Sequence, residues 1–177
     1  MWTTSVYYKK YTHMVQIATA KGDLDPVEWC KENLRGAHKK REHGSTRSRS
    51  ITRFYCTSSG YDLLMSTFAD RVVEHSKPFN DIAEQQLLQG LTLELRDHLY
   101  YKKYRYSLHL SARNFDVKDW CKSNLGVFKK DYFHTCGASS LYLKSNDELL
   151  HVKLALSEYI IFAKCAWLED EVVKAIR

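Results

Sequence analysis

The sequence lacks several features that would assign it to a specific class of protein. No apolar run comes close to the roughly 20 residues that a membrane-spanning helix needs. The N-terminus also lacks the basic-then-apolar order of a secretory signal. We therefore expect no membrane partner and a cytoplasmic location, which would be the host cell cytoplasm if the protein is viral.

Signals for metals and cofactors are also missing. The five cysteines are an odd number, and no two of them form a Cys-x-x-Cys pair, so neither a disulfide framework nor a zinc site is indicated. There is no glycine-rich phosphate loop. We expect no metal site and no cofactor. Cys30 and Cys121 each follow a tryptophan in a predicted helix, a place that suits a small buried side chain.

Two segments of the sequence occur twice. The pentapeptide Tyr-Tyr-Lys-Lys-Tyr at residues 7–11 recurs unchanged at 100–104, and residues 25–34 return in altered form at 116–125. Two segments that repeat in the same order indicate a duplicated module.

Both copies predict the same order of elements. Alternating side chains over 6–19 and 101–112 predict a first strand, and Asp25 or Asp116 provides the cap of a helix. Two strands, a capped second helix and a short apolar strand follow. This order is that of a ferredoxin-like βαββαβ unit, an antiparallel sheet with two helices on one face.

The sequence therefore predicts an α/β (α+β) protein of two tandem ferredoxin-like units. We assign residues 1–79 to the first repeat and 100–177, with a C-terminal helix, to the second. Apolar residues at helical spacing predict that residues 80–99 form a connecting helix. The oligomeric state stays open.

Positive charge and aromatic rings suggest a nucleic acid as the partner. The net charge is +6, and residues 38–53 hold six Lys or Arg against one Glu. Cations neutralise phosphates, and rings on an open sheet face stack on unpaired bases. The candidate phosphate contacts are Lys39, Lys40, Arg41, Arg47, Arg49 and Arg53. The candidate stacking residues are Tyr8, Tyr11, Tyr55, Tyr101, Tyr104 and Tyr142.

Two other interpretations stay open. Tyrosine also favours strands and packs in cores, and the consensus signature of an RNA-recognition motif is absent. The protein could instead be an interaction or virion structural module that docks a host or viral protein, such as an acidic surface, through its open sheet or connecting helix. Eight histidines would also suit an endoribonuclease of tandem ferredoxin-like type, although no catalytic residue stands out.

Residues 116–122 and 141–154 resemble segments of small uncharacterised α/β proteins of tailed phages. Those proteins combine a strand, a Trp-Cys-bearing helix, an aromatic strand and an acidic helix start in one short unit. The resemblance implies a viral origin and a small accessory or structural role, and it implies no known activity. Together, the observations favour a non-catalytic viral accessory or regulatory protein that binds nucleic acid, RNA in preference to DNA.

Overall fold

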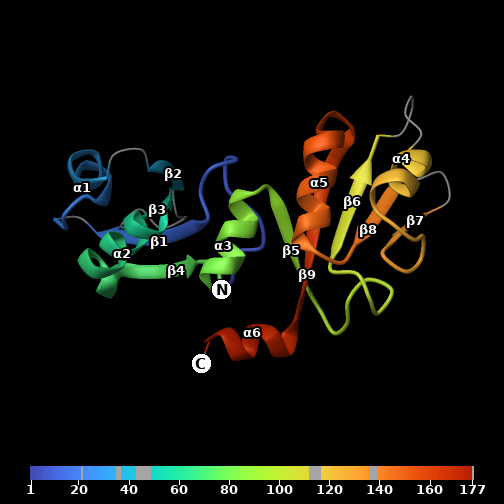
Figure 1. The fold of residues 1–177 in the computed structure, drawn as a ribbon. Helices are drawn as coiled ribbons and strands as arrows, with labels where there is room; N and C mark the ends of the chain where they lie inside the picture. The colour runs from blue at the N-terminus through green and yellow to red at the C-terminus, as the bar shows by residue number, and fades with distance from the viewer. Residues whose placement is uncertain (21, 35–36, 43–48, 112–116, 136–138, 177) are drawn as a thin grey trace. The chain divides into compact units, whose positions relative to one another are not determined.

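The computed structural model describes residues 1–20, 22–34, 37–42, 49–111, 117–135 and 139–176. Over these residues the chain has two β-sheets and six α-helices (Figure 1), which confirms the predicted mixed α/β class. It divides into two compact units, Met1–Glu84 (unit 1) and Gln85–Arg177 (unit 2). Within the described ranges, no helix is both long and apolar enough to cross a membrane.

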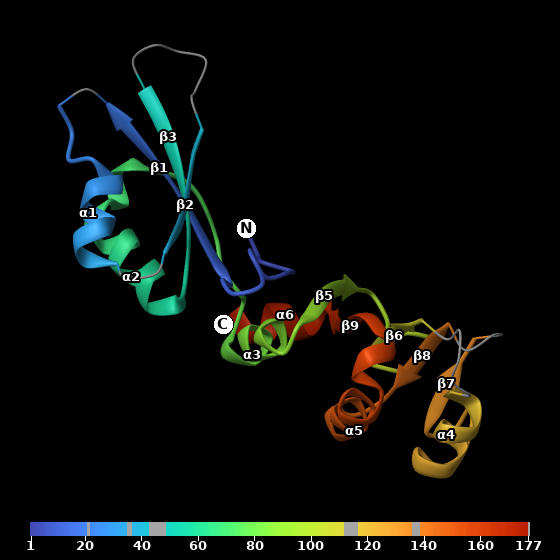
Figure 2. The same ribbon diagram turned by 90° about the horizontal axis from the view of Figure 1, so that it is seen from above.

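Unit 1 holds a four-stranded antiparallel sheet in the order β2-β3-β1-β4. Its strands are β1 (His13–Ala20), β2 (His38–Glu42), β3 (Arg49–Cys56) and β4 (Val72–Ser76). The helices α1 (Pro26–Asn33) and α2 (Ser58–Thr67) lie on one side of this sheet (Figure 2). Neither α1 nor α2 lies on the other face (Figure 2).

The core of unit 1 lies between the sheet and these two helices. Ile17 of β1 and Phe54 of β3 are fully buried against Cys30 of α1 and Leu64 of α2. Removing such side chains from water supplies most of the stabilisation of a small unit. The core placement expected for Cys30 is confirmed, and Cys121 is buried in unit 2 in the same way.

Unit 2 holds a five-stranded sheet in the order β5-β9-β6-β8-β7. Its strands are β5 (Leu91–Arg96), β6 (Tyr106–Leu110), β7 (Tyr132–His134), β8 (Ser140–Leu143) and β9 (Ile160–Leu168). Only the β5–β9 pair is parallel among these strands. Without β5, the order β9-β6-β8-β7 matches the order β4-β1-β3-β2 of unit 1.

Two helices of unit 2 lie between its strands in sequence, as in unit 1. They are α4 (Val117–Asn124) and α5 (Asn146–Leu156). Residues 145–148 predict a capping box at the start of the second helix of the second copy, and α5 has it. Ser145 accepts a hydrogen bond from the Glu148 N–H at 3.2 Å, and Glu148 accepts one from the Ser145 N–H at 3.1 Å. The cap that Asp25 was expected to form on α1 is also present, with the Val27 N–H as donor at 2.8 Å.

The connecting helix predicted for residues 80–99 is wrong beyond Leu88. Helix α3 (Asp81–Leu88) ends there, Gly90 has a φ of +81°, and residues 91–96 form β5. Leu91 and Leu93 alternate with polar residues and are buried beside β9. Strand alternation therefore prevails over the helical spacing of Ile82, Leu88, Leu91 and Leu95, on which the prediction rested. The expected C-terminal helix is present as α6 (Glu169–Ile176).

The repeated pentapeptide forms a turn, and not the beginning of the first strand of each copy as predicted. In unit 1, the N–H of Lys10 donates to the Tyr7 carbonyl at 3.0 Å, and the φ angles of Tyr8 and Lys9 are +51° and +58°. Two consecutive left-handed residues characterise the type I′ turn, which favours Asn-Gly. The strand β1 therefore begins only at His13.

Unit 2 repeats this turn almost unchanged. The N–H of Lys103 donates to the Tyr100 carbonyl at 3.0 Å, and Tyr101 and Lys102 have φ angles of +48° and +58°. Bulky residues rarely adopt this conformation, which costs roughly 1–2 kcal/mol each. We call residues 7–11 and 100–104 the Tyr-Lys turns.

Candidate nucleic-acid interface

The face of the unit 2 sheet that carries Ser107, His109 and Tyr142 holds a groove of about 500 Å³. Four strands and the Tyr-Lys turn of this unit contribute to it, so residues far apart in the sequence meet there. We call this site the unit 2 groove. It is lined by Glu94, Arg96, Tyr100, Tyr101, Ser107, His109, Ser140, Tyr142, Phe162 and Lys164.

Strand register arranges part of this face as a straight row. Phe133 of β7 lies opposite Tyr142 of β8, which lies opposite Ser107 of β6, which lies opposite Lys164 of β9. Residues directly opposite each other in antiparallel strands have Cβ atoms about 5 Å apart. The row therefore runs from two aromatic rings through a hydroxyl to a cation.

A second row runs beside the first. His109 of β6 lies opposite Ser140 on one side and Phe162 on the other. The rings of His109 and Phe162 are stacked, with centroids 5.0 Å apart and an angle of 14° between their planes. This pair forms an aromatic wall of the unit 2 groove.

The charged end of the unit 2 groove surrounds Glu94. Its carboxylate accepts hydrogen bonds from Lys164 at 2.5 Å, Tyr100 at 2.8 Å and Arg96 at 3.3 Å. Burial pushes the pKa of Glu94 up, but these hydrogen bonds outweigh it and hold the pKa below its ordinary value. Two cations beside one carboxylate leave this end with net positive charge.

Tyr100 and Arg96 also hold each other in place. The Arg96 guanidinium lies 4.6 Å from the centroid of the Tyr100 ring, a cation–π contact. Burial and the hydrogen bond to Glu94 raise the pKa of Tyr100 far above its ordinary value, so this phenol stays protonated and acts as a donor. The charged end is therefore preorganised within unit 2.

Tyr101 extends from its turn over the open face. It is 59% exposed, and its ring centroid lies 5.0 Å from that of Tyr142 and 4.7 Å from that of Phe133. Both neighbouring rings meet it edge-on. A rigid turn with two supporting rings presents this aromatic side chain to solvent at low entropic cost.

The other predicted stacking residues divide into two groups. Tyr8 is 54% exposed and lies against Tyr55, with ring centroids 5.0 Å apart. Tyr11, Tyr55 and Tyr104 are buried, so their ring faces are not available to bases, and this part of the prediction needs correction. The turn folds back on itself and directs its last tyrosine into a local core, which strand alternation alone did not indicate.

The predicted phosphate contacts are only partly within the described structure. Arg53 lies in β3 and is partly buried. Arg47, and the side chains of Lys39, Lys40, Arg41 and Arg49, lie outside the described residues. A phosphate-binding role for this segment stays a prediction.

The equivalent face of unit 1 has different chemistry. In its register Met14 lies between Tyr55 and Ser76, where unit 2 has Ser107 between Tyr142 and Lys164. The Ser76 hydroxyl hydrogen-bonds with the Tyr7 phenol at 2.9 Å. The two units thus share the tyrosine framework, but a serine in the middle of the row and a cation at its end are found only in unit 2.

Sequence reasoning missed the charged end of the site. Arg96 and Glu94 fell within a segment predicted to be helical. Lys164 lay in a predicted strand, but the sequence did not show on which face of the sheet its side chain would lie. The period-two pattern of residues 91–96 was the available signal. It would have placed Glu94 and Arg96 on one face of a strand.

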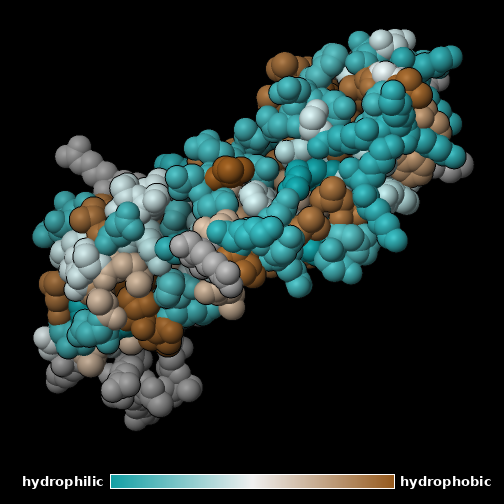
Figure 3. All heavy atoms as spheres, turned by 60° about the horizontal axis from the view of Figure 1, so that its bottom comes forward, coloured by the Kyte–Doolittle hydropathy of each residue, from teal (hydrophilic) through white to brown (hydrophobic). Residues whose placement is uncertain are grey.

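One face of the molecule is largely polar (Figure 3). On the face drawn in Figure 3, hydrophobic residues of the described chain form separate small groups among hydrophilic ones. His109 is the one histidine among the described residues that line the unit 2 groove. The described side chains include no group of three or more His, Cys, Asp or Glu placed to hold a metal ion.

No family model, curated protein or solved structure matches this chain. The resemblance to phage proteins and the viral origin that it implies stay predictions.

Proposed function

We propose that the chain is a tandem pair of ferredoxin-like units. Matching strand orders, the shared Tyr-Lys turn and a helix after the last strand of each sheet support this proposal. The parallel bridge between Trp2 and Lys77 also supports it. Lys77 directly follows β4, so Trp2 pairs in parallel with the end of the last strand of unit 1, as β5 pairs in parallel with β9 in unit 2. In both units a parallel edge segment precedes the turn.

We further propose that the protein binds single-stranded nucleic acid, without catalysing a reaction, through the unit 2 groove. The row from Phe133 and Tyr142 through Ser107 to Lys164 carries this proposal. Aromatic rings stack on bases of any sequence, and each such contact contributes about 1–3 kcal/mol. A cation at the other end of the row suits the phosphate of the same nucleotide.

The size of the site agrees with such a ligand. A volume of about 500 Å³ lies within the range of small-molecule pockets, roughly 300–1,000 Å³, and suits one or two nucleotides. Tyr101 stands at the rim as a further stacking surface, and Arg96 adds a second cation. The bound nucleic acid would lie with its bases over β7 and β8 and its phosphates over β9 and β5.

A salt titration tests this function. The affinity for a fluorescent oligouridine of about eight nucleotides, measured by anisotropy, should fall linearly on a log–log plot against salt. Lys164→Gln and Arg96→Gln should each reduce the slope by about 0.7, the value for one phosphate contact to a single strand. Lys122→Gln is the matched control, because it removes the same charge from the exposed surface of α4.

Two results would count against the proposal. One is binding that does not depend on salt, and the other is equal loss of affinity in Lys122→Gln and Lys164→Gln. Either result would favour the alternative of a module that docks an acidic protein surface.

A further inference from the structure

The order of groups in the unit 2 groove matches the order of groups in a nucleotide. The sugar of a nucleotide lies between its base and its phosphate. In the groove, the hydroxyl of Ser107 lies between the ring of Tyr142 and the ammonium of Lys164, on three adjacent strands. A base over Tyr142 and a phosphate at Lys164 would therefore bring the sugar to Ser107.

We propose that Ser107 accepts a hydrogen bond from the ribose 2′-hydroxyl and makes the groove selective for RNA over DNA. This inference rests on the proposed function, because it identifies the sugar of the polynucleotide that the same site binds. The 2′-hydroxyl is the group by which a protein distinguishes RNA from DNA at a given site.

The surroundings of Ser107 suit an acceptor. Ser107 lies directly opposite Tyr142 on one side and Lys164 on the other, and its side chain lines the groove together with Ser140. A serine hydroxyl has one proton to donate and two lone pairs to accept with. The lone pairs of Ser107 can therefore accept from a sugar hydroxyl, and DNA has no donor to offer there.

Unit 1 provides an internal contrast. Met14 occupies the position of Ser107, and Ser76 occupies that of Lys164. A thioether is only a weak acceptor, and no cation stands at the end of that row. The sugar-reading arrangement is therefore a property of unit 2 and not of the shared framework.

The test compares oligouridine with oligodeoxyuridine of about eight nucleotides, which differ only in the sugar. The wild-type protein should bind the RNA about fivefold more tightly, as expected for one hydrogen bond. Ser107→Ala should lose this preference while its affinity for DNA stays unchanged. Ser107→Thr keeps a hydroxyl and suits a strand, so it should retain the preference. Ser123→Ala, on the exposed surface of α4, is the control.

The outcomes separate the two proposals. Equal binding of RNA and DNA by the wild-type protein would overturn the sugar selectivity and leave nucleic-acid binding intact. Selectivity that persists in Ser107→Ala, with a thermal unfolding curve like that of the wild type, would also overturn it. If neither oligonucleotide binds, both proposals fall.

Discussion

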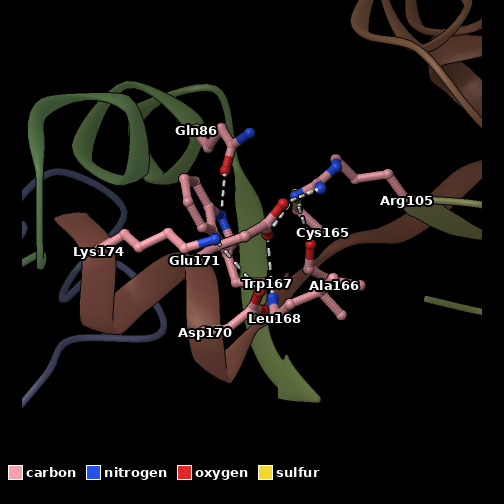
Figure 4. A network of polar contacts seen from close by, with 9 residues as sticks. All are labelled: Gln86, Arg105, Cys165, Ala166, Trp167, Leu168, Asp170, Glu171 and Lys174. Atoms are coloured by element: carbon pink, nitrogen blue, oxygen red, sulfur yellow. Dashed lines mark hydrogen bonds and ion pairs between the residues drawn. The ribbon is translucent and has the colours of Figure 1, made fainter. Parts of the chain in front are cut away.

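Arg105 and Glu171 form an ion pair with two hydrogen bonds, 2.6 and 3.0 Å long (Figure 4). The pair fixes α6 to Arg105, the residue that directly precedes β6. The Leu168 N–H donates to the same carboxylate at 3.1 Å, and Arg105 also donates to the Ala166 carbonyl at 3.1 Å. The hydrogen bonds from Arg105 hold the pKa of Glu171 below its ordinary value. In unit 1, Thr12 follows the Tyr-Lys turn as Arg105 does and donates to Glu84 of α3 at 2.7 Å.

We expect Glu171→Gln to lower the free energy of unfolding by about 1–2 kcal/mol, because it leaves a partly buried guanidinium without its charged partner. Urea denaturation followed by circular dichroism measures the change. Asp170→Asn breaks the exposed pair with Lys174 and serves as the control, with little change expected. Equal effects of the two substitutions would contradict the role of Arg105.

The Tyr-Lys turn of unit 2 predicts a stabilising substitution. Lys102 has a φ of +58°, which glycine adopts without a steric penalty, so Lys102→Gly should raise the free energy of unfolding by about 0.5–1 kcal/mol. Lys102→Val should lower it, because a β-branched side chain is strained there. Urea midpoints of the two variants give the comparison.

The control for that substitution lies in a helix. Lys122→Gly in α4 should cost about 1 kcal/mol, since glycine weakens a helix interior. A loss of stability in Lys102→Gly similar to that in Lys122→Gly would show that the turn is not strained.

The buried His13 predicts a dependence of stability on pH. Burial lowers the pKa of His13 below its ordinary value of 6.5, although the charges of Glu84 and Asp62 act in the opposite direction. The folded state therefore binds this proton less readily than the unfolded state. Neutral His13 therefore makes its full contribution to the free energy of unfolding above about pH 6.5. That contribution is lost as the pH falls through and below this value.

Urea midpoints at about pH 7.5 and about pH 5 test this expectation, because Asp and Glu titrate mostly below that window. His13→Gln should reduce the difference between the two midpoints. His151→Gln, at an exposed position of α5, should leave it unchanged. A pH difference that is the same in wild type and His13→Gln would rule out His13 as its source.

The two exposed turn tyrosines form a matched pair for binding experiments. Tyr101→Ala should weaken oligouridine binding by about tenfold or more, which corresponds to the loss of one stacking contact. Tyr8→Ala changes the equivalent tyrosine in the turn of unit 1. The row of unit 1 has Ser76 where unit 2 has Lys164, so we expect less than about a twofold effect. Tyr101→Trp should keep the affinity. Equal losses for Tyr8→Ala and Tyr101→Ala would place the site outside the unit 2 groove.

The sequence by itself determined the elements whose signals are local. The caps at Asp25 and Ser145 depend on side chains within a few residues of the backbone groups that they satisfy, so the helix starts followed from sequence. The alternation over Tyr106–Leu110 determined which side chains of β6 face the core and which face the groove. The repeated segments at 7–11 and 100–104 were visible directly in the sequence.

Tertiary structure decided the features that depend on partners distant in the chain. Residues 91–96 satisfy both helical and strand spacing, and pairing with β9 selected the strand. The Tyr-Lys segments became turns because Tyr11 and Tyr104 bury their rings in local cores, which no local pattern specifies. The groove required the register of β6 with β8 and β9, since only that register brings Ser107 beside Tyr142 and Lys164.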